Sequence, residues 1–196
     1  MTDRDAADGT GARTRERTPF SAPARFIQGS GIPGLGSGWG PGGVYYVRIT
    51  PDTIVVRDVR GRRQIEEVPQ AALDAAGRVV AVGREAGHLS GQGDLAAGLR
   101  SPFARSSLDV GDVDLAAGIV RHLVRGLRRV PWVPVMIRGM IVHPDFAAAD
   151  PLSTDERDAF IVMAKRAGAR TAQVWEGRPL GDDEVLDAIV PPAHRL

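Results

Sequence analysis

Six residues near the N-terminus have the spacing of a dinucleotide-binding loop. Residues 29–34 read GSGIPG and match the pattern G-x-G-x-x-G, whose glycines let the backbone N–H groups of a following helix reach a pyrophosphate. That chemistry requires a strand before the loop and a helix after it. The preceding TPFSAPARFIQ does not read as a buried strand, and the following LGSGWGPGG is too rich in glycine for a helix. We therefore interpret this stretch as a flexible linker and not as a phosphate-binding site.

The remaining polar side chains show no pattern for metal binding or catalysis. The histidines have no carboxylate or second histidine at the spacing of metal ligands; they are His88, His122, His143 and His194. No serine stands in a nucleophile motif beside a base. The acidic run at residues 182–184 is typical of the first turn of a helix. The sequence therefore predicts no catalytic centre, no metal site and no enzyme activity.

Composition narrows the function classes further. The chain has 196 residues, of which 43% are hydrophobic and 25% charged, as in ordinary globular proteins. A net charge of +1 gives no basic surface for nucleic acid, and the absence of cysteine excludes disulfides. No apolar run has the length of a transmembrane helix, and the N-terminus lacks the apolar core of a secretory signal. We expect a cytoplasmic protein, either free or at the inner face of the membrane.

The chain divides into a tail and one domain. Residues 1–43 are polar and then glycine-rich, with too little apolar surface to offset the entropy of ordering, so we expect a disordered tail. Residues 44–190 form the expected domain, and residues 191–196 form a short C-terminal tail. The sequence leaves the oligomeric state open.

Hydrophobic patterns within the domain predict alternating strands and helices. Three short β-rich runs from residue 44 to residue 68 indicate a meander, and residues 77–83 indicate a further strand. Residues 90–107 have the composition of a loop. Asp112 is expected to cap a helix, and Ser153 with Glu156 forms the capping box of another. The expected strands at residues 133–143 and 170–175 alternate with these helices, and a short helix ends the domain. This order predicts an α/β fold with a mixed sheet.

Three strings in this order resemble the MreB family of bacterial actins, which includes Mbl. GRVVAVGREA at residues 77–86 is similar to GKVLAVGDEA of that family, and DVDLAAGIVRHLVR corresponds to a family helix. The long string IVHPDFAAADPLSTDERDAFIVMAKRAGARTAQVWE matches a proline-ended strand, a helix that opens TEVERRA, the sequence AGAR, a strand and a glutamate. The resemblance covers residues 44–186. It implies a single subdomain of the actin-like, ribonuclease H-like fold, with a mixed five-stranded sheet and flanking helices.

The resemblance also locates a nucleotide site, whose sequence departs from the family. The family's first phosphate loop reads DLGTANT, and its aspartate holds the metal. Here that place reads VRITPDTIVV, with Arg48 at the position of the aspartate and with Pro51, which has no N–H group. Asp52 is the carboxylate nearest to Arg48 in the sequence. The degenerate site positions are Arg48, Thr50, Asp52, Thr53 and Glu176.

These departures imply that the protein acts by binding other proteins. In the family, ATP lies between two halves, and this chain corresponds to one half. We therefore expect a truncated, nucleotide-degenerate relative with no cofactor. Its partners would be a full-length MreB-type filament or the cell-shape and envelope machinery. Two alternatives remain. One is an actin-like protein that binds ATP with magnesium and completes its site with a partner chain, and the other is a small interaction module on a ribonuclease H-like fold unrelated to filaments.

Overall fold

The largest sheet is built around strands whose side chains are buried on both faces. The computed structural model describes residues 25–28, 42–91, 98–103, 112–127, 136–146 and 151–189. The strands of this sheet lie in the order β1-β9-β8-β2-β3-β4; they are β1 (Arg25–Gln28), β2 (Gly43–Ile49), β3 (Ile54–Asp58), β4 (Arg63–Glu67), β8 (Ile137–Pro144) and β9 (Ala169–Glu176). The expected mixed five-stranded sheet is confirmed in β9-β8-β2-β3-β4, and β1 adds a strand at one edge.

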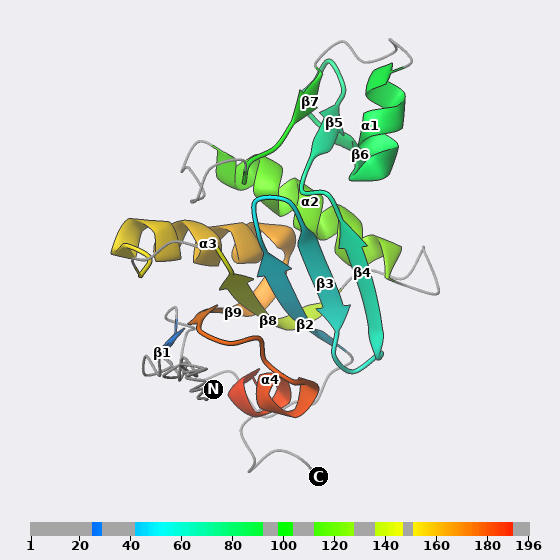
Figure 1. The fold of residues 1–196 in the computed structure, drawn as a ribbon. Coiled ribbons are helices and arrows are strands. Elements are labelled where there is room, and N and C mark those ends of the chain that lie inside the picture. Colours follow the sequence, from blue (N-terminus) through cyan, green and yellow to red (C-terminus); the bar gives the residue numbers. More distant parts are fainter. Residues whose placement is uncertain are drawn as a thin grey trace, which may run out of the picture.

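The sheet is antiparallel on one side and parallel on the other. Strands β2, β3 and β4 form the expected antiparallel meander. Strands β2, β8 and β9 run parallel, and parallel neighbours need a crossover, which is usually a helix. Helices α2 (Val113–Gly126) and α3 (Thr154–Ala167) supply these crossovers. Both helices lie on the same face of the sheet (Figure 1). The carboxyl ends of the three parallel strands therefore meet at one edge.

Helix α3 begins and ends where its sequence indicates. The Ser153 side chain accepts a hydrogen bond from the Glu156 backbone, and the Glu156 side chain accepts one from the Ser153 backbone. This capping box satisfies N–H groups that the first helical turn leaves without partners. At the other end, Gly168 has φ 110°, a left-handed conformation that glycine adopts without strain. The boundaries of α3 were thus predictable from local sequence.

Helix α2 begins differently from the sequence prediction. Asp112 stands at the N-cap position as expected, but its side chain makes no capping hydrogen bond. Its carboxylate accepts a hydrogen bond from Arg100 at 3.1 Å. That arginine lies in β7 (Leu99–Arg100), inside the stretch interpreted as loop. The competing ion pair explains why the side chain does not cap the helix.

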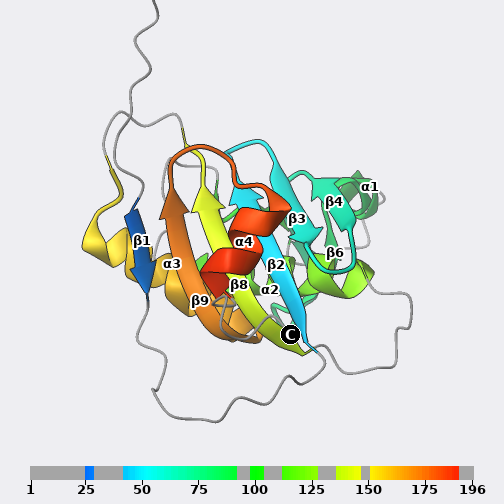
Figure 2. The ribbon, with the colours of Figure 1, turned by 90° about the horizontal axis from the view of Figure 1, so that it is seen from below.

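The two faces of the larger sheet have different coverings. Tyr45, Val47 and Ile49 point into the main core with α2 and α3. Val44 and Tyr46 point to the opposite face, where they pack with Val185 of helix α4 (Asp182–Ile189). Figure 2 shows α4 lying over β8 and β2, while β3 and β4 extend beyond it. One face is therefore a closed apolar core, and the other is covered only in part.

A second, smaller sheet was not foreseen as a separate unit. Strands β5 (Ala71–Leu73), β6 (Val79–Val82) and β7 pair in the order β6-β5-β7, next to helix α1 (Arg84–Gly91). Strand β6 corresponds to the strand expected at residues 77–83. Strands β5 and β7 are three and two residues long, too short for a periodic pattern. Figure 1 shows this sheet beyond α2, away from α4.

The predicted tails lie mainly outside the described residues. Within residues 1–43 the structure describes β1, residue 42 and the first residue of β2; β1 pairs antiparallel with β9, so this part of the expected disordered tail is a strand. The glycine-rich stretch at residues 29–34 and residues 191–196 are outside the description. Among the described residues, no helix combines the length and apolar character needed to cross a membrane.

Truncation of Phe160 tests the packing of α3 on the sheet. This side chain is 0% exposed, and its ring centroid lies 6.2 Å from that of Phe146. We expect Phe160→Ala to lower the free energy of unfolding by about 3–5 kcal/mol, as large core truncations do. Val162 lies on the same helix and is 39% exposed. The control Val162→Ala should cost less than about 1 kcal/mol. Equal losses in denaturant titrations would contradict the assigned buried face.

Candidate functional site

The candidate site lies where the parallel strands of the larger sheet end. In α/β sheets, ligands usually bind beyond the carboxyl ends of the strands. Here β2 leads into Thr50, β8 into Asp145, and β9 ends at Glu176. Arg48, Thr50 and Glu176 are among the nucleotide-site positions that the family resemblance implied. The topology brings them to the same edge, together with Asp145.

The turn between β2 and β3 is closed by hydrogen bonds within itself. The Thr50 N–H donates to the Thr53 carbonyl at 2.8 Å. The Thr53 N–H donates to the Thr50 hydroxyl at 2.9 Å, and that hydroxyl donates to the Thr53 carbonyl at 3.1 Å. Pro51 has no N–H group, and Asp52 is exposed at the tip of the turn. The N–H groups of both threonines are therefore used inside the turn.

Arg48 forms an ion pair with Asp145 across the ends of β2 and β8. The Arg48 Nε lies 2.7 Å and the Nη2 2.5 Å from Asp145 Oδ2. The Asp145 N–H donates to the Ile49 carbonyl at 2.7 Å, which holds the aspartate beside β2. The two side chains are 40% and 35% exposed. The carboxylate at this edge therefore has a guanidinium as its neighbour.

Asp145 was missing from the residues predicted from sequence. It lies 97 positions from Arg48, and no local pattern relates positions so far apart. One usable signal was its place directly after Pro144, at the end of an apolar strand. An aspartate at the carboxyl end of a buried parallel strand is a candidate for ligand contact.

Glu176 has partners of its own, away from Arg48. Its Oε1 accepts a hydrogen bond from Arg157 Nε at 2.7 Å, and its Oε2 accepts one from the Leu152 N–H at 3.0 Å. These contacts connect the end of β9 to the start of α3. Glu176 is therefore a structural contact in this chain, and it does not line the pocket that contains Arg48.

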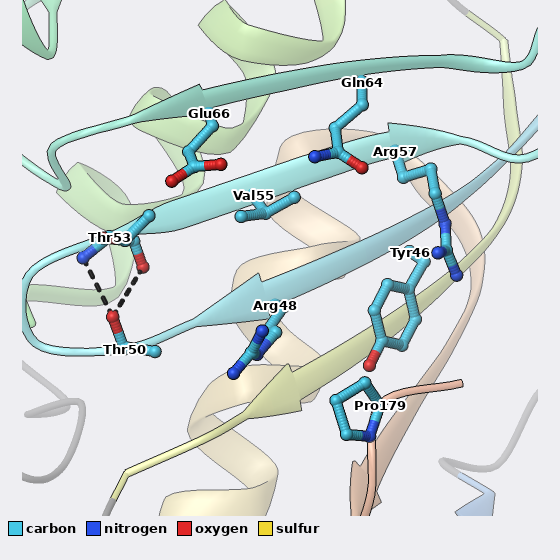
Figure 3. A pocket seen from close by; sticks show the side chains of 9 residues that line it. All are labelled: Tyr46, Arg48, Thr50, Thr53, Val55, Arg57, Gln64, Glu66 and Pro179. Atoms are coloured by element: carbon cyan, nitrogen blue, oxygen red, sulfur yellow. Dashed lines mark hydrogen bonds between the residues drawn. The ribbon is translucent and has the colours of Figure 1, made fainter. Parts of the chain in front are cut away.

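Three of the five predicted residues line one pocket of about 320 Å³. Arg48, Thr50 and Thr53 lie in it, and Asp52 does not. The other lining residues come from β2, β3, β4 and the segment before α4; they are Tyr46, Val55, Arg57, Gln64, Glu66 and Pro179. Figure 3 shows these side chains on one face of the meander. The pocket occupies the part of the sheet that α4 leaves uncovered.

Strand register orders the pocket into rows. Arg48 pairs with Val55, and Val55 pairs with Glu66, so a cation and an anion flank an apolar residue. Tyr46, Arg57 and Gln64 form the adjacent row. The alternation of side chains along β2 and β3 is a period-two pattern, which was the available signal for these residues. The pocket thus has mixed charge.

The second arginine of the pocket is also engaged. The guanidinium carbon of Arg57 lies 4.8 Å from the centroid of the Tyr46 ring. Its Nη2 donates to the Leu180 carbonyl at 2.5 Å, and its Nε lies 3.0 Å from Asp182 Oδ1 without hydrogen-bond geometry. Arg57 therefore ties α4 and the segment before it to β3.

A buried hydrogen-bonded network lies beneath the pocket. The Tyr46 hydroxyl lies 2.5 Å from His143 Nδ1 and accepts a hydrogen bond from the Leu180 N–H at 3.3 Å. The His143 imidazole also hydrogen bonds to the Gly177 backbone. Burial raises the pKa of Tyr46 and lowers the pKa of His143. Both shifts favour the neutral forms, and the network connects β2, β8 and the segment before α4.

Gly139 allows α4 to approach β8. A Cβ atom at this position would lie 2.3 Å from Ile189 of α4. The helix therefore rests directly on the strand backbone.

Within the described ranges, no three histidine, aspartate or glutamate side chains are grouped so as to hold a metal ion.

Comparisons with known proteins show the fold. No protein-family model and no curated protein matches the sequence. A solved structure of a non-polymerising MamK mutant bound to AMPPNP is 17% identical over 68% of this chain and 40% of that chain, with a TM-score of 0.51. MreB 5 of Spiroplasma citri is 15% identical in its AMPPNP-bound structure and 16% in its ADP-bound structure. These alignments cover 68% and 69% of this chain and 38% of each MreB 5 chain, with TM-scores of 0.46 and 0.48.

The MamK alignment identifies the fold as actin-like. The protein spans about two-fifths of the length of the MamK chain that it matches. The expected actin-like α/β fold is therefore confirmed.

Acidification tests the buried His143 network. Because the pKa of His143 is lower in the folded state, the unfolded chain takes up this proton first as the pH falls. Its contribution to stability is complete above the ordinary histidine pKa of about 6.5 and decreases below it. We expect a slope of at most about 1.4 kcal/mol per pH unit for one proton. His143→Gln should remove this slope in denaturant titrations between pH 7 and pH 5, and the control His122→Gln on α2 should keep it. An unchanged slope in His143→Gln would contradict the assignment.

Proposed function

We propose that this protein is an actin-like, cytoskeleton-associated protein that acts by binding other proteins, and that its nucleotide site is degenerate. The observation that carries the proposal is the ion pair between Arg48 and Asp145. The resemblance to MreB proteins puts a metal-holding aspartate at position 48. Instead, this chain has a guanidinium there, and that guanidinium pairs with the Asp145 carboxylate.

The chemistry of magnesium binding supports this proposal. Magnesium in nucleotide sites needs oxygen ligands, most often carboxylates together with water and phosphate oxygens. The Asp145 carboxylate lies against Arg48, and Glu176 is held by Arg157 and by the Leu152 backbone. A cation at this edge would have to displace an arginine from either carboxylate. The donor set therefore does not fit a magnesium–nucleotide complex.

The turn between β2 and β3 offers few backbone donors to a phosphate. A phosphate loop presents several free N–H groups to the phosphate oxygens. In the turn from Thr50 to Thr53, both threonine N–H groups are already hydrogen-bonded, and Pro51 has none. Arg48 and Arg57 could each pair with a phosphate, but their present contacts with Asp145 and Asp182 would have to break. We infer that ATP does not bind tightly to this chain alone.

The proposed action through partners rests on the resemblance to the actin-like family. The MamK chain was solved with AMPPNP, and this protein spans 40% of that chain. In the actin-like family the nucleotide lies between two halves, and this chain corresponds to the first. A protein with this half can contact a full-length MreB-type filament or the cell-shape machinery through its surface. We propose the filament as the first partner to test.

Calorimetry with Mg-ATP tests the degenerate site. We expect a dissociation constant weaker than about 1 mM for the isolated chain, which corresponds to a binding free energy of about −4 kcal/mol or less favourable. Micromolar binding by the isolated chain would overturn the proposal. Arg48→Ala serves as the matched variant and should leave this weak binding unchanged.

A second titration, in the presence of a full-length MreB-type protein, distinguishes the alternatives. If the mixture binds or hydrolyses ATP beyond the sum of its components, and Arg48→Ala abolishes that excess, the chain completes a composite site. The proposal predicts no such excess. It predicts that the chain co-sediments with the filament, and absence from the pellet would contradict the filament partner.

A further inference from the structure

The two edges of the larger sheet differ in the way they are protected. An edge strand presents unpaired N–H and C=O groups that can pair with another strand. At one edge, β4 has five residues with the sequence RQIEE, and its length and charges discourage such pairing. On the other side β1 is the outermost strand, and β9 next to it has eight residues, of which Ala169, Ala172, Val174 and Trp175 are buried apolar residues. The β9 edge is therefore the one that needs a cover.

Strand β1 covers half of the β9 edge. It pairs antiparallel with residues 173–176 (Figure 2). The register sets residues of matching type opposite each other: Arg25 with Glu176, Phe26 with Trp175, Ile27 with Val174, and Gln28 with Gln173. The antiparallel register therefore fixes which residue of RFIQ pairs with which residue of β9.

We propose that the β9 edge is a strand-docking site and that β1 is exchanged through it, so that β1 of one copy pairs with β9 of a second copy. Main-chain hydrogen bonds supply affinity in such strand addition, and the opposed side chains supply selectivity. The exchanged contact is the same as the contact within one chain, so exchange costs little beyond bringing two copies together. The site needs no nucleotide and does not depend on the proposed function.

The connection between β1 and β2 is long enough for exchange. Strands β1 and β2 are three strand positions apart in the sheet, which corresponds to about 14 Å. Residues 29–42 join them, and a chain of that length can span up to about 50 Å. The number of residues in the connection therefore does not restrict β1 to the β9 strand of its own chain. Pairing within one chain corresponds to an effective concentration of order millimolar, so exchange should increase as the local protein concentration approaches that range.

Single-cysteine variants of the full chain test the exchange. The protein has no cysteine, so any disulfide reports the introduced pair. Chains with Gln28→Cys are mixed with chains carrying Gln173→Cys and oxidised. We expect a covalent heterodimer whose yield rises roughly tenfold or more between about 10 µM and about 1 mM protein. In the double variant at the lower concentration, we expect an intramolecular disulfide.

The controls separate docking from random collision. Replacing Gln173→Cys by Asp52→Cys, in the exposed turn, should leave only a background yield. Adding Phe26→Pro to the Gln28→Cys chain should reduce the heterodimer to that background, because proline disrupts strand pairing. Ser30→Pro, outside β1, should not. A second pair, Arg25→Cys with Glu176→Cys, covers the case in which the buried Gln173 does not tolerate substitution.

Two results would overturn the proposal. A heterodimer yield equal to that of the Asp52→Cys control at about 1 mM would show that β1 is not exchanged. Absence of the intramolecular disulfide in both double variants would show that β1 does not dock on β9 at all.

Discussion

The ion pair between Arg48 and Asp145 sets the chemistry of the edge at which the parallel strands end. It joins β2 to β8 at their carboxyl ends, next to the hydrogen bond from the Asp145 N–H to the Ile49 carbonyl. Both side chains are more than one-third exposed, so the pair itself contributes only about 0–1 kcal/mol to stability. Its main consequence is electrostatic. It places a guanidinium directly beside the Asp145 carboxylate at this edge.

The uncovered face of the meander follows from the same strand. Along β2, alternate residues enter the apolar core, and the intervening Tyr46 and Arg48 point to the opposite face. Tyr46 lies at the boundary of α4, with its ring beneath Arg57 and its hydroxyl bonded to His143. Beyond that boundary the face is lined mainly by polar and charged side chains. An antiparallel sheet can present such a face to water, and therefore the pocket requires no further helix for stability.

Local sequence was sufficient for the main elements but not for the site. The capping box of Ser153 and Glu156 fixed the start of α3, and alternating β-rich runs located β2 and β3. Strands β1, β5 and β7 have two to four residues, and such short segments show no period. The contact of Arg48 with Asp145 joins positions 97 residues apart, so it arises only from the parallel pairing of β2 and β8. Asp52 shows that closeness in sequence did not identify the site residue: it is the carboxylate nearest to Arg48 in the sequence, but it does not line the pocket.

The central proposal is that the carboxyl edge of the sheet does not bind a magnesium–nucleotide complex, and a residue-resolved titration tests it most directly. Amide signals of Thr50, Thr53 and Asp145 can be followed by ¹H–¹⁵N NMR while Mg-ATP is added to the isolated chain. Two of these N–H groups hydrogen bond within the turn, and the third bonds to Ile49. The account predicts that these three signals remain in place up to about 0.1 mM Mg-ATP, where a dissociation constant weaker than about 1 mM leaves less than about a tenth of the sites occupied. Saturable shifts of all three at micromolar Mg-ATP would contradict it.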